Sequence, residues 1–126
     1  MREAVIELLE SWGCVGAAYD PALDLTIANA VWKVKNETNL TQLPEGLENV
    51  AVSIAAGEYL KWKKNTGQLK SFDLQAAVKQ LQEGDTTISF AVGEGSLTPE
   101  QRLDQLIDSL INGRMRELYR YRRLAW

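Results

Sequence analysis

Two pairs of acidic side chains have a spacing that could support chemistry. Glu83 and Asp85 flank one glycine, and Asp104 and Asp108 lie four residues apart, on one face of an expected helix. Two neighbouring carboxylates can bind a divalent metal ion or act as general acid and base. Solvated turns and helix faces carry the same pattern far more often, so we interpret both pairs as structural.

The chain has one cysteine, Cys14, and no histidine. The lack of histidine excludes Ser-His-Asp and Cys-His catalysis, zinc sites that contain histidine, and the usual general base near neutral pH. Cys14 cannot form an internal disulfide, and we expect it to be a buried structural thiol. The short run Gly93-Glu94-Gly95 lacks the lysine of a phosphate-binding loop. We therefore expect no metal, no cofactor and no enzymatic activity.

The end of the chain is basic and aromatic. Between Gly113 and Trp126 there are five arginines and one acid, a local net charge of +4. Because the helix dipole favours cations near a helix C-terminus, a solvated helix end is one interpretation. The other is a flexible docking arm over about residues 120–126, since arginine, tyrosine and tryptophan are enriched at interface hot spots. An unpartnered terminal indole would remain in water, which favours the docking arm, with Arg120, Tyr121, Arg122, Arg123 and Trp126 as its contact residues.

Length and composition indicate one soluble domain over residues 1–126. The chain is 45% hydrophobic and 25% charged, and no apolar run approaches the roughly 20 residues that span a bilayer. The N-terminus places acids among its apolar residues, unlike a signal peptide, so we expect an intracellular product with no membrane partner.

The net charge of −3 is unevenly distributed along the chain. Residues 1–60 carry three basic and nine acidic side chains, a net charge of −6, whereas residues 61–126 carry eleven basic and eight acidic, a net charge of +3. Opposite charges on the two halves suit head-to-tail packing between copies. A dedicated nucleic-acid binder would be far more basic.

Apolar periodicity and capping signals predict a mainly helical bundle. Helices are expected over residues 2–12, from Pro21 to about residue 36, from Pro44 to about residue 64, and as one long helix from Thr98 to Trp126 that is kinked near Gly113. The buried stripe of the second helix is predicted to contain Leu23, Ile27, Ala28, Val31, Trp32 and Val34. Lysines at the end of the third helix fit a solvated helix end, with phosphate binding as the alternative.

Residues 68–97 have a different pattern. Residues 86–92 alternate as a strand would, but residues 74–81 have helical spacing, so their structure is ambiguous. Because a lone strand is unstable in water, its partner would be residues 77–82, in a hairpin around Gly84, or a strand of another copy. We expect the hairpin, or an extended loop, over about residues 77–92.

Three stretches together resemble one protein family. They are a loop into a helix at residues 43–60, the segment at residues 78–90 that contains Glu-Gly-Asp-Thr-Thr-Ile-Ser-Phe, and the closing Tyr-Arg-Arg-Leu-Ala-Trp at residues 121–126. This combination resembles the small head–tail connector proteins, also called adaptor or head-completion proteins, of long-tailed bacteriophages and prophages. The resemblance covers about residues 20–126.

The resemblance implies a virion structural protein that is made in the bacterial host cytoplasm. It implies a ring of about a dozen copies that docks on the portal, receives a tail or stopper protein, and lets DNA pass through its lumen without sequence specificity. Residues 83–90 would project to neighbouring subunits or line the channel, and residues 120–126 would grip the portal or an adjacent subunit. The interface residues of the first segment would be Glu83, Gly84, Asp85, Thr87, Ile88 and Phe90.

Two other functions fit parts of the sequence. A small helical DNA-binding or regulatory protein would use Arg114 to Arg123 on phosphates, and its binding would weaken steeply with salt. A histidine-free enzyme would use Asp104 and Asp108.

Overall fold

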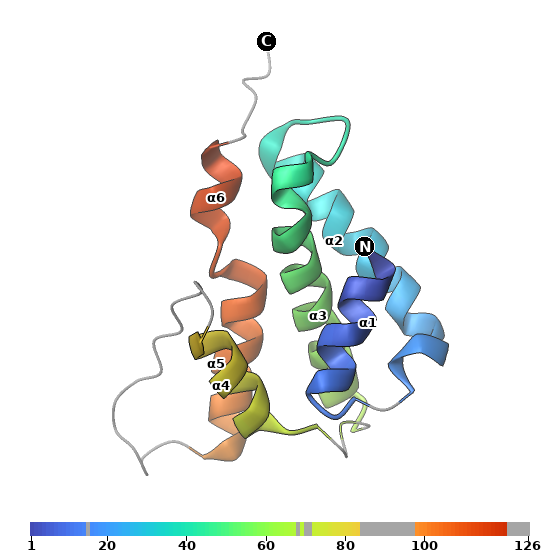
Figure 1. Ribbon diagram of the computed structural model, residues 1–126, viewed down its shortest axis with the longest axis vertical. Helices are drawn as coiled ribbons and strands as arrows, with labels where there is room; N and C mark the ends of the chain where they lie inside the picture. The colour runs from blue at the N-terminus through green and yellow to red at the C-terminus, as the bar shows by residue number, and fades with distance from the viewer. Residues whose placement is uncertain (15, 68, 70–71, 84–97, 121–126) are drawn as a thin grey trace.

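The computed structural model describes residues 1–14, 16–67, 69, 72–83 and 98–120. These residues form helix α1 (Arg2–Ser11), the 3-10 turn η1 (Ala17–Tyr19), α2 (Pro21–Thr38), the 3-10 turn η2 (Glu45–Leu47), α3 (Glu48–Asn65), α4 (Leu74–Glu83), α5 (Pro99–Asn112) and α6 (Met115–Arg120). The described part of the chain is mainly helical and contains no strand, which confirms the predicted helical bundle. In Figure 1, α3 lies in the middle of the molecule, with α1 and α2 on one side of it and α5 on the other.

The central position of α3 follows from its sequence. Its apolar and small residues occur around most of the helix circumference, so it can be covered from several sides. The buried residues are Val50, Ala51, Ile54, Ala55, Ala56, Gly57, Tyr59 and Leu60. Helical spacing in the sequence predicts a buried face of Leu47, Val50, Ala51, Ile54 and Ala55, extended by Tyr59 and Leu60, and this face is confirmed. Helices α1, α2 and α5 all pack against α3.

A glycine lets α3 and α5 approach closely. A Cβ added at Gly57 would lie 2.8 Å from Cγ1 of Ile111 and 2.9 Å from Cβ of Leu110. One turn earlier, the Oγ of Ser53 donates a hydrogen bond of 2.8 Å to the carbonyl oxygen of Leu110. Small residues on α3 therefore set the distance between the two helices.

The N-termini of α2 and α5 are capped as the sequence predicts. The carboxylate of Asp20 accepts a hydrogen bond of 3.0 Å from the backbone N–H of Ala22, and Pro21 occupies the first turn. At α5, Thr98 and Gln101 form a reciprocal capping box ahead of Pro99.

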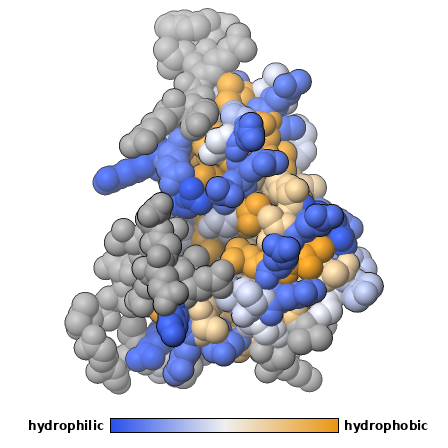
Figure 2. All heavy atoms as spheres, viewed as in Figure 1, coloured by the Kyte–Doolittle hydropathy of each residue, from blue (hydrophilic) through white to orange (hydrophobic). Residues whose placement is uncertain are grey.

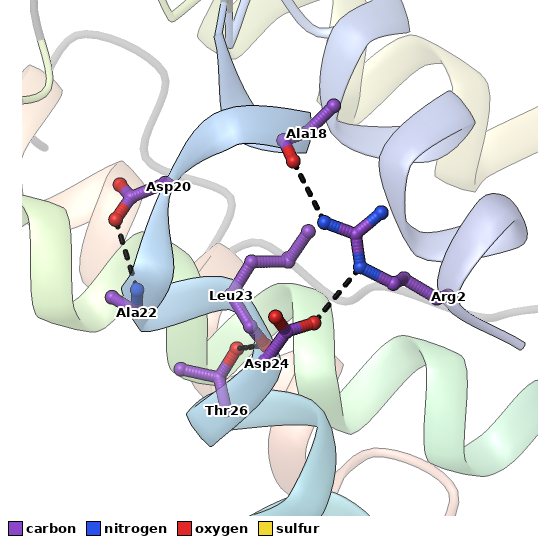
Figure 3. A network of polar contacts seen from close by, with 7 residues as sticks. All are labelled: Arg2, Ala18, Asp20, Ala22, Leu23, Asp24 and Thr26. Atoms are coloured by element: carbon purple, nitrogen blue, oxygen red, sulfur yellow. Dashed lines mark hydrogen bonds and ion pairs between the residues drawn. The ribbon is translucent and has the colours of Figure 1, made fainter.

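Arg2 joins α1 to the start of α2. Figure 3 shows its guanidinium donating to the carbonyl oxygen of Ala18 at 2.7 Å and to the carboxylate of Asp24 at 2.8 Å. The same view shows Thr26, whose hydroxyl donates to the carbonyl oxygen of Leu23. One side chain thus connects α1, η1 and α2.

The prediction of one long C-terminal helix is wrong. The α5 helix ends at Asn112, and α6 begins at Met115. The backbone N–H of Gly113 still bonds to the carbonyl oxygen of Ser109, but glycine is a poor helix former and the helix does not continue through it. Helix α6 packs against α2, and its Leu118 is fully buried.

The predicted hairpin around Gly84 is also not formed, because residues 77–82 belong to α4. Asp73 accepts a hydrogen bond from the backbone N–H of Ala76 and begins the helix, while its own N–H donates to the carbonyl oxygen of Trp12 at 2.7 Å. The rings of Trp12 and Phe72 meet edge to face, with 6.4 Å between centroids. The helical spacing that starts at Leu74 therefore decided the structure, and the predicted second strand, residues 86–92, lies outside the described residues.

Candidate functional site

Most of the predicted interface residues lie outside the part of the chain that the structure describes. Glu83 is the last residue of α4, and Arg120 is the last residue of α6. The structure does not describe the others, which are Gly84, Asp85, Thr87, Ile88, Phe90, Tyr121, Arg122, Arg123 and Trp126. The two predicted contact segments thus begin where described helices end.

The outer side of α2 carries large exposed apolar side chains. Leu25 is 59% exposed and Trp32 is 65% exposed, and Ala28 and Asn29 between them are also exposed. The spacing i, i+3, i+4, i+7 places these four residues on one face, which we call the α2 face. Two large apolar side chains on one helix face, one of them a tryptophan, form a candidate contact surface, because tryptophan is enriched at interface hot spots.

The predicted buried stripe of α2 is correct in part. Leu23 and Val34 are buried as predicted and Ile27 packs against the core, but Ala28 and Trp32 are exposed. Thr26, Ala30 and Thr38 complete the buried side instead. The two threonines are satisfied inside the protein, since their hydroxyls donate to the carbonyl oxygens of Leu23 and Val34. Such back-bonding lets a polar residue face the core, and an apolar pattern cannot reveal it.

Three more aromatic side chains are exposed around the bundle. Tyr19 is 91% exposed just before α2, Trp62 is half exposed on α3, and Tyr119 is 54% exposed on α6. Figure 2 shows that hydrophobic residues also reach the surface in the middle of the face it draws, over α1 and α3, with hydrophilic residues around them. These side chains suit protein contacts, which tyrosine and tryptophan favour.

A partly buried polar junction joins α2 to α3. The hydroxyl of Tyr59 donates to Oδ2 of Asp20 at 2.9 Å, and the ammonium of Lys63 pairs with the same oxygen. The ammonium also lies 5.6 Å from the centroid of the Tyr59 ring. Both charged side chains are less than a fifth exposed, so the pair is shielded from solvent. The prediction that the lysines at the end of α3 are exposed to solvent is therefore wrong for Lys63.

The junction shifts the pKa values of its members. Burial raises the pKa of Asp20, but the hydrogen bonds from Lys63, Ala22 and Tyr59 outweigh it, so the pKa lies below its ordinary value of 3.8. Burial, together with the hydrogen bond to the carboxylate, raises the pKa of Tyr59. The junction therefore holds an ionised carboxylate and a neutral phenol at neutral pH.

Cys14 is buried, as the sequence predicts. Burial raises the pKa of its thiol to about 11, although the charge of Lys63 acts in the opposite direction. The thiol is therefore protonated at neutral pH and is a poor nucleophile.

Asp104 and Asp108 form structural contacts, in keeping with their interpretation as a helix face. Asp104 pairs with the ammonium of Lys64, which also lies 3.8 Å from a carboxylate oxygen of Glu100. Asp108 accepts a hydrogen bond of 2.9 Å from the side-chain amide of Asn112. Their surroundings form an open groove of about 370 Å³ between α3 and α5, whose charged lining is Lys33, Glu58, Lys61, Lys64, Asp104 and Asp108.

A second groove, of about 360 Å³, lies between the end of α3 and the start of α5, beside the N-terminus of α4. Its lining is mainly apolar, with Lys64 and Glu100 at its edge, and includes Leu69, Phe72, Leu74 and Leu103. The four apolar side chains are only partly buried. The groove is shallow and lacks the convergent polar groups of a small-molecule site.

The short helix α6 presents a basic and aromatic surface. Arg114 forms a two-point ion pair with Glu117, with N–O distances of 2.9 and 2.8 Å. Arg116 and Tyr119 are exposed, and Arg116 has no ion pair within the described part of the chain. We call Arg116 and Tyr119 the α6 face.

Comparison with family models, with curated proteins and with solved structures finds no match for this chain.

The described residues contain no group of three or more cysteine, aspartate or glutamate side chains that could hold a metal ion. Among the same residues, no helix is long and apolar enough to cross a membrane. The described surface instead carries exposed aromatic residues, charged side chains without an ion pair, and shallow grooves. These features are suited to contacts between proteins.

Proposed function

We propose that this chain is the subunit of a ring-forming head–tail connector, or adaptor, of a long-tailed bacteriophage or prophage. In this proposal the ring docks on the portal, forms part of the DNA channel and joins head to tail. The observation that carries the proposal is the exposure of Leu25 and Trp32 on the outer face of a helix whose opposite face is fully packed. A subunit that stays in a permanent assembly can keep such side chains, because its partner covers them.

The resemblance of residues 43–60, 78–90 and 121–126 to connector proteins supports the same function. The mainly helical architecture agrees with a connector subunit. After correction of the hairpin, the proposal keeps residues 83–90 as the segment that contacts neighbours or lines the channel.

The places where the contact segments join the bundle also support the proposal. Figure 1 shows that α4 and the start of α5 lie in the lower half of the molecule as drawn. Helix α6 lies in the upper half, toward the end where α2 connects to α3. Attachment at separate ends suits a subunit that contacts a portal on one side and a tail or stopper protein on the other.

The proposal places the protein at the head–tail junction of the virion, after synthesis in the host cytoplasm. DNA passes through the ring without sequence specificity. A net charge of −3 suits this passage, because a strongly basic lumen would bind phosphates and slow the DNA.

Capture by the portal protein encoded beside this chain tests the proposal. We expect the full-length protein to bind the purified portal, and a variant that lacks residues 121–126 to lose at least about 30-fold in affinity, as hot-spot residues do. The control is Lys79→Ala, which removes an exposed charge from α4 and should leave binding unchanged. Full-length protein that fails to bind the portal at any concentration would contradict the proposal.

A second candidate is a helical DNA-binding protein. Arg116, which is exposed and has no ion pair among the described residues, favours it together with the arginines at 120, 122 and 123. This function requires binding to double-stranded DNA that falls steeply with salt and disappears when Arg120, Arg122 and Arg123 are replaced by alanine. Portal binding that survives high salt, without measurable DNA binding, would exclude this candidate.

A further inference from the structure

Asn112 is the one asparagine in the sequence that is followed by a glycine. In such a pair the backbone nitrogen of the glycine can attack the side-chain carbonyl carbon of the asparagine, because glycine has no side chain that hinders the approach. Asn112 and Gly113 are both exposed, and they lie where α5 ends, shortly before α6 begins. The pair is therefore accessible to water at the joint between two helices.

The last turn of α5 holds both nitrogen atoms that this reaction needs. The backbone N–H of Gly113 donates to the carbonyl oxygen of Ser109 at 2.9 Å. The side-chain amide of Asn112 donates to Oδ1 of Asp108, also at 2.9 Å. Gly113 has a helical backbone, with φ of −67° and ψ of −18°, which keeps its N–H directed at the preceding turn. The attack therefore requires this turn to open.

We propose that Asn112 is a site of spontaneous deamidation, with water as the only co-reactant, and that opening of the last turn of α5 controls its rate. In the open turn, the nitrogen of Gly113 forms a bond to Cγ of Asn112. The proton of Gly113 passes through water to Nδ2, the bond from Cγ to Nδ2 breaks, and ammonia leaves a succinimide ring. Water then adds to one of the two ring carbonyls, and the ring opens to aspartate or isoaspartate.

The docking of α6 opposes this opening. Helix ends open more readily than helix interiors, because fewer contacts hold them. Here α6 packs against α2 with Leu118 fully buried, so the backbone on the far side of Gly113 is held in place. Because ring closure is slow and opening of a turn is fast, the rate of deamidation follows the population of the open turn.

Deamidation changes the joint in two ways. A carboxylate at position 112 lies one turn from Asp108 and close to the negative end of the α5 dipole, and both interactions are unfavourable. Isoaspartate also adds one carbon atom to the backbone between α5 and α6. The modified protein should therefore dock α6 less firmly on α2.

Peptide mass spectrometry of the full-length protein, kept at mildly alkaline pH, measures the conversion. Aspartate and isoaspartate should accumulate at position 112 faster than at any of the other five asparagines. Conversion should be at least about tenfold slower than in the same protein in urea, because the folded turn is mostly closed. Asn112→Gln is the control, since it keeps an amide but its longer side chain closes a ring far more slowly.

Two variants test control by the turn, each with a matched control. Leu118→Ala weakens the docking of α6 and should speed conversion at least about tenfold. Leu9→Ala makes the same change at a fully buried position of α1 and should leave the rate nearly unchanged.

Asp108→Ala releases the side-chain amide of Asn112 and should speed conversion at least about twofold. Its control, Glu7→Ala, removes an exposed acid from α1 and should not change the rate. Because Asp108 is exposed, this variant should keep the fold even if Leu118→Ala does not, and circular dichroism checks each protein.

Three results would overturn the inference. Native protein that stays unmodified at position 112 while the sample in urea converts would exclude the site. Equal acceleration by Leu118→Ala and Leu9→Ala would assign the reaction to global unfolding, and an Asp108→Ala rate equal to that of the wild type would remove the control by the turn. These measurements need no portal protein, so their outcome is separate from that of the connector function.

Discussion

At the scale of single residues, Asp20 has two roles. One carboxylate oxygen caps α2, and the other binds Tyr59 and Lys63 of α3. An N-cap contributes about 1 kcal/mol, and leaving the ammonium of a partly buried pair without a partner costs roughly 2 kcal/mol. Asparagine at this position could still cap the helix but could not pair with Lys63.

We therefore expect Asp20→Asn to lower the free energy of unfolding at pH 7 by about 2 kcal/mol and Asp20→Ala by about 3 kcal/mol. Urea denaturation followed by circular dichroism measures both. Equal losses in the two variants would show that the cap and the ion pair do not act separately.

The ionisation of Asp20 should also make the stability of the folded protein depend on pH in the acid range. Its pKa is lower in the folded protein than the ordinary value of 3.8, so the folded state favours the ionised form. The stabilisation is complete above the unfolded value and is lost as the pH falls through the folded pKa, from about pH 4 downward. Denaturation curves between about pH 5 and pH 2 should show a smaller loss in Asp20→Asn than in the wild type.

Cys14 provides a second test at this scale. With a pKa of about 11 rather than 9.0, its thiolate fraction near pH 7.5 is about one hundredfold lower than that of an exposed cysteine. We expect alkylation by iodoacetamide to be at least that much slower in the native protein than in urea. Alkylation at the same rate in both states would place the thiol at the surface.

At the scale of helices, small residues decide where the elements sit. Gly57 lets α3 contact α5, and Gly113 separates α5 from α6 so that Leu118 can be buried near α2. Glycine is unfavourable inside a helix by about 1 kcal/mol, and at Gly57 the packing of two helices offsets this cost.

Gly57→Ala therefore should destabilise the protein, although alanine is the better helix former. The new Cβ would be closer to Ile111 and Leu110 than side chains tolerate, and overpacking costs about 1–3 kcal/mol. Adding Ile111→Ala should recover part of the loss in a double-mutant cycle by thermal melting. Stabilisation by the single variant would mean that α3 and α5 are farther apart than described.

At the scale of the whole molecule, the separation of charge predicts how assembly depends on salt. If acidic and basic halves meet across the contact between copies, screening should weaken it, because the Debye length falls from about 10 Å at 0.1 M salt to about 3 Å at 1 M. Sedimentation velocity at low and high salt should show assemblies that shrink as salt rises. Assembly that increases with salt would indicate a contact held by apolar burial alone.

The sequence by itself determined the features that depend on local chemistry. Asp20 with Pro21, and Thr98 with Gln101, marked the helix starts because capping needs only neighbouring residues. The buried face of α3 was also readable, since a helix covered on several sides must be apolar over most of its surface. The absence of histidine excluded whole classes of site before any fold was known.

Only the tertiary structure decided which apolar residues face water and which charges find partners. Trp32 lies outside because threonines that bond to their own helix can occupy the inner side of α2, and Lys63 is shielded because α3 places it beside Asp20. The segment ahead of α4 is fixed to a residue distant in sequence, since the ring of Phe72 meets that of Trp12 and the N–H of Asp73 donates to the carbonyl oxygen of Trp12. The Lys63–Asp20 and Phe72–Trp12 contacts join segments far apart along the chain, and a local pattern contains no information about them.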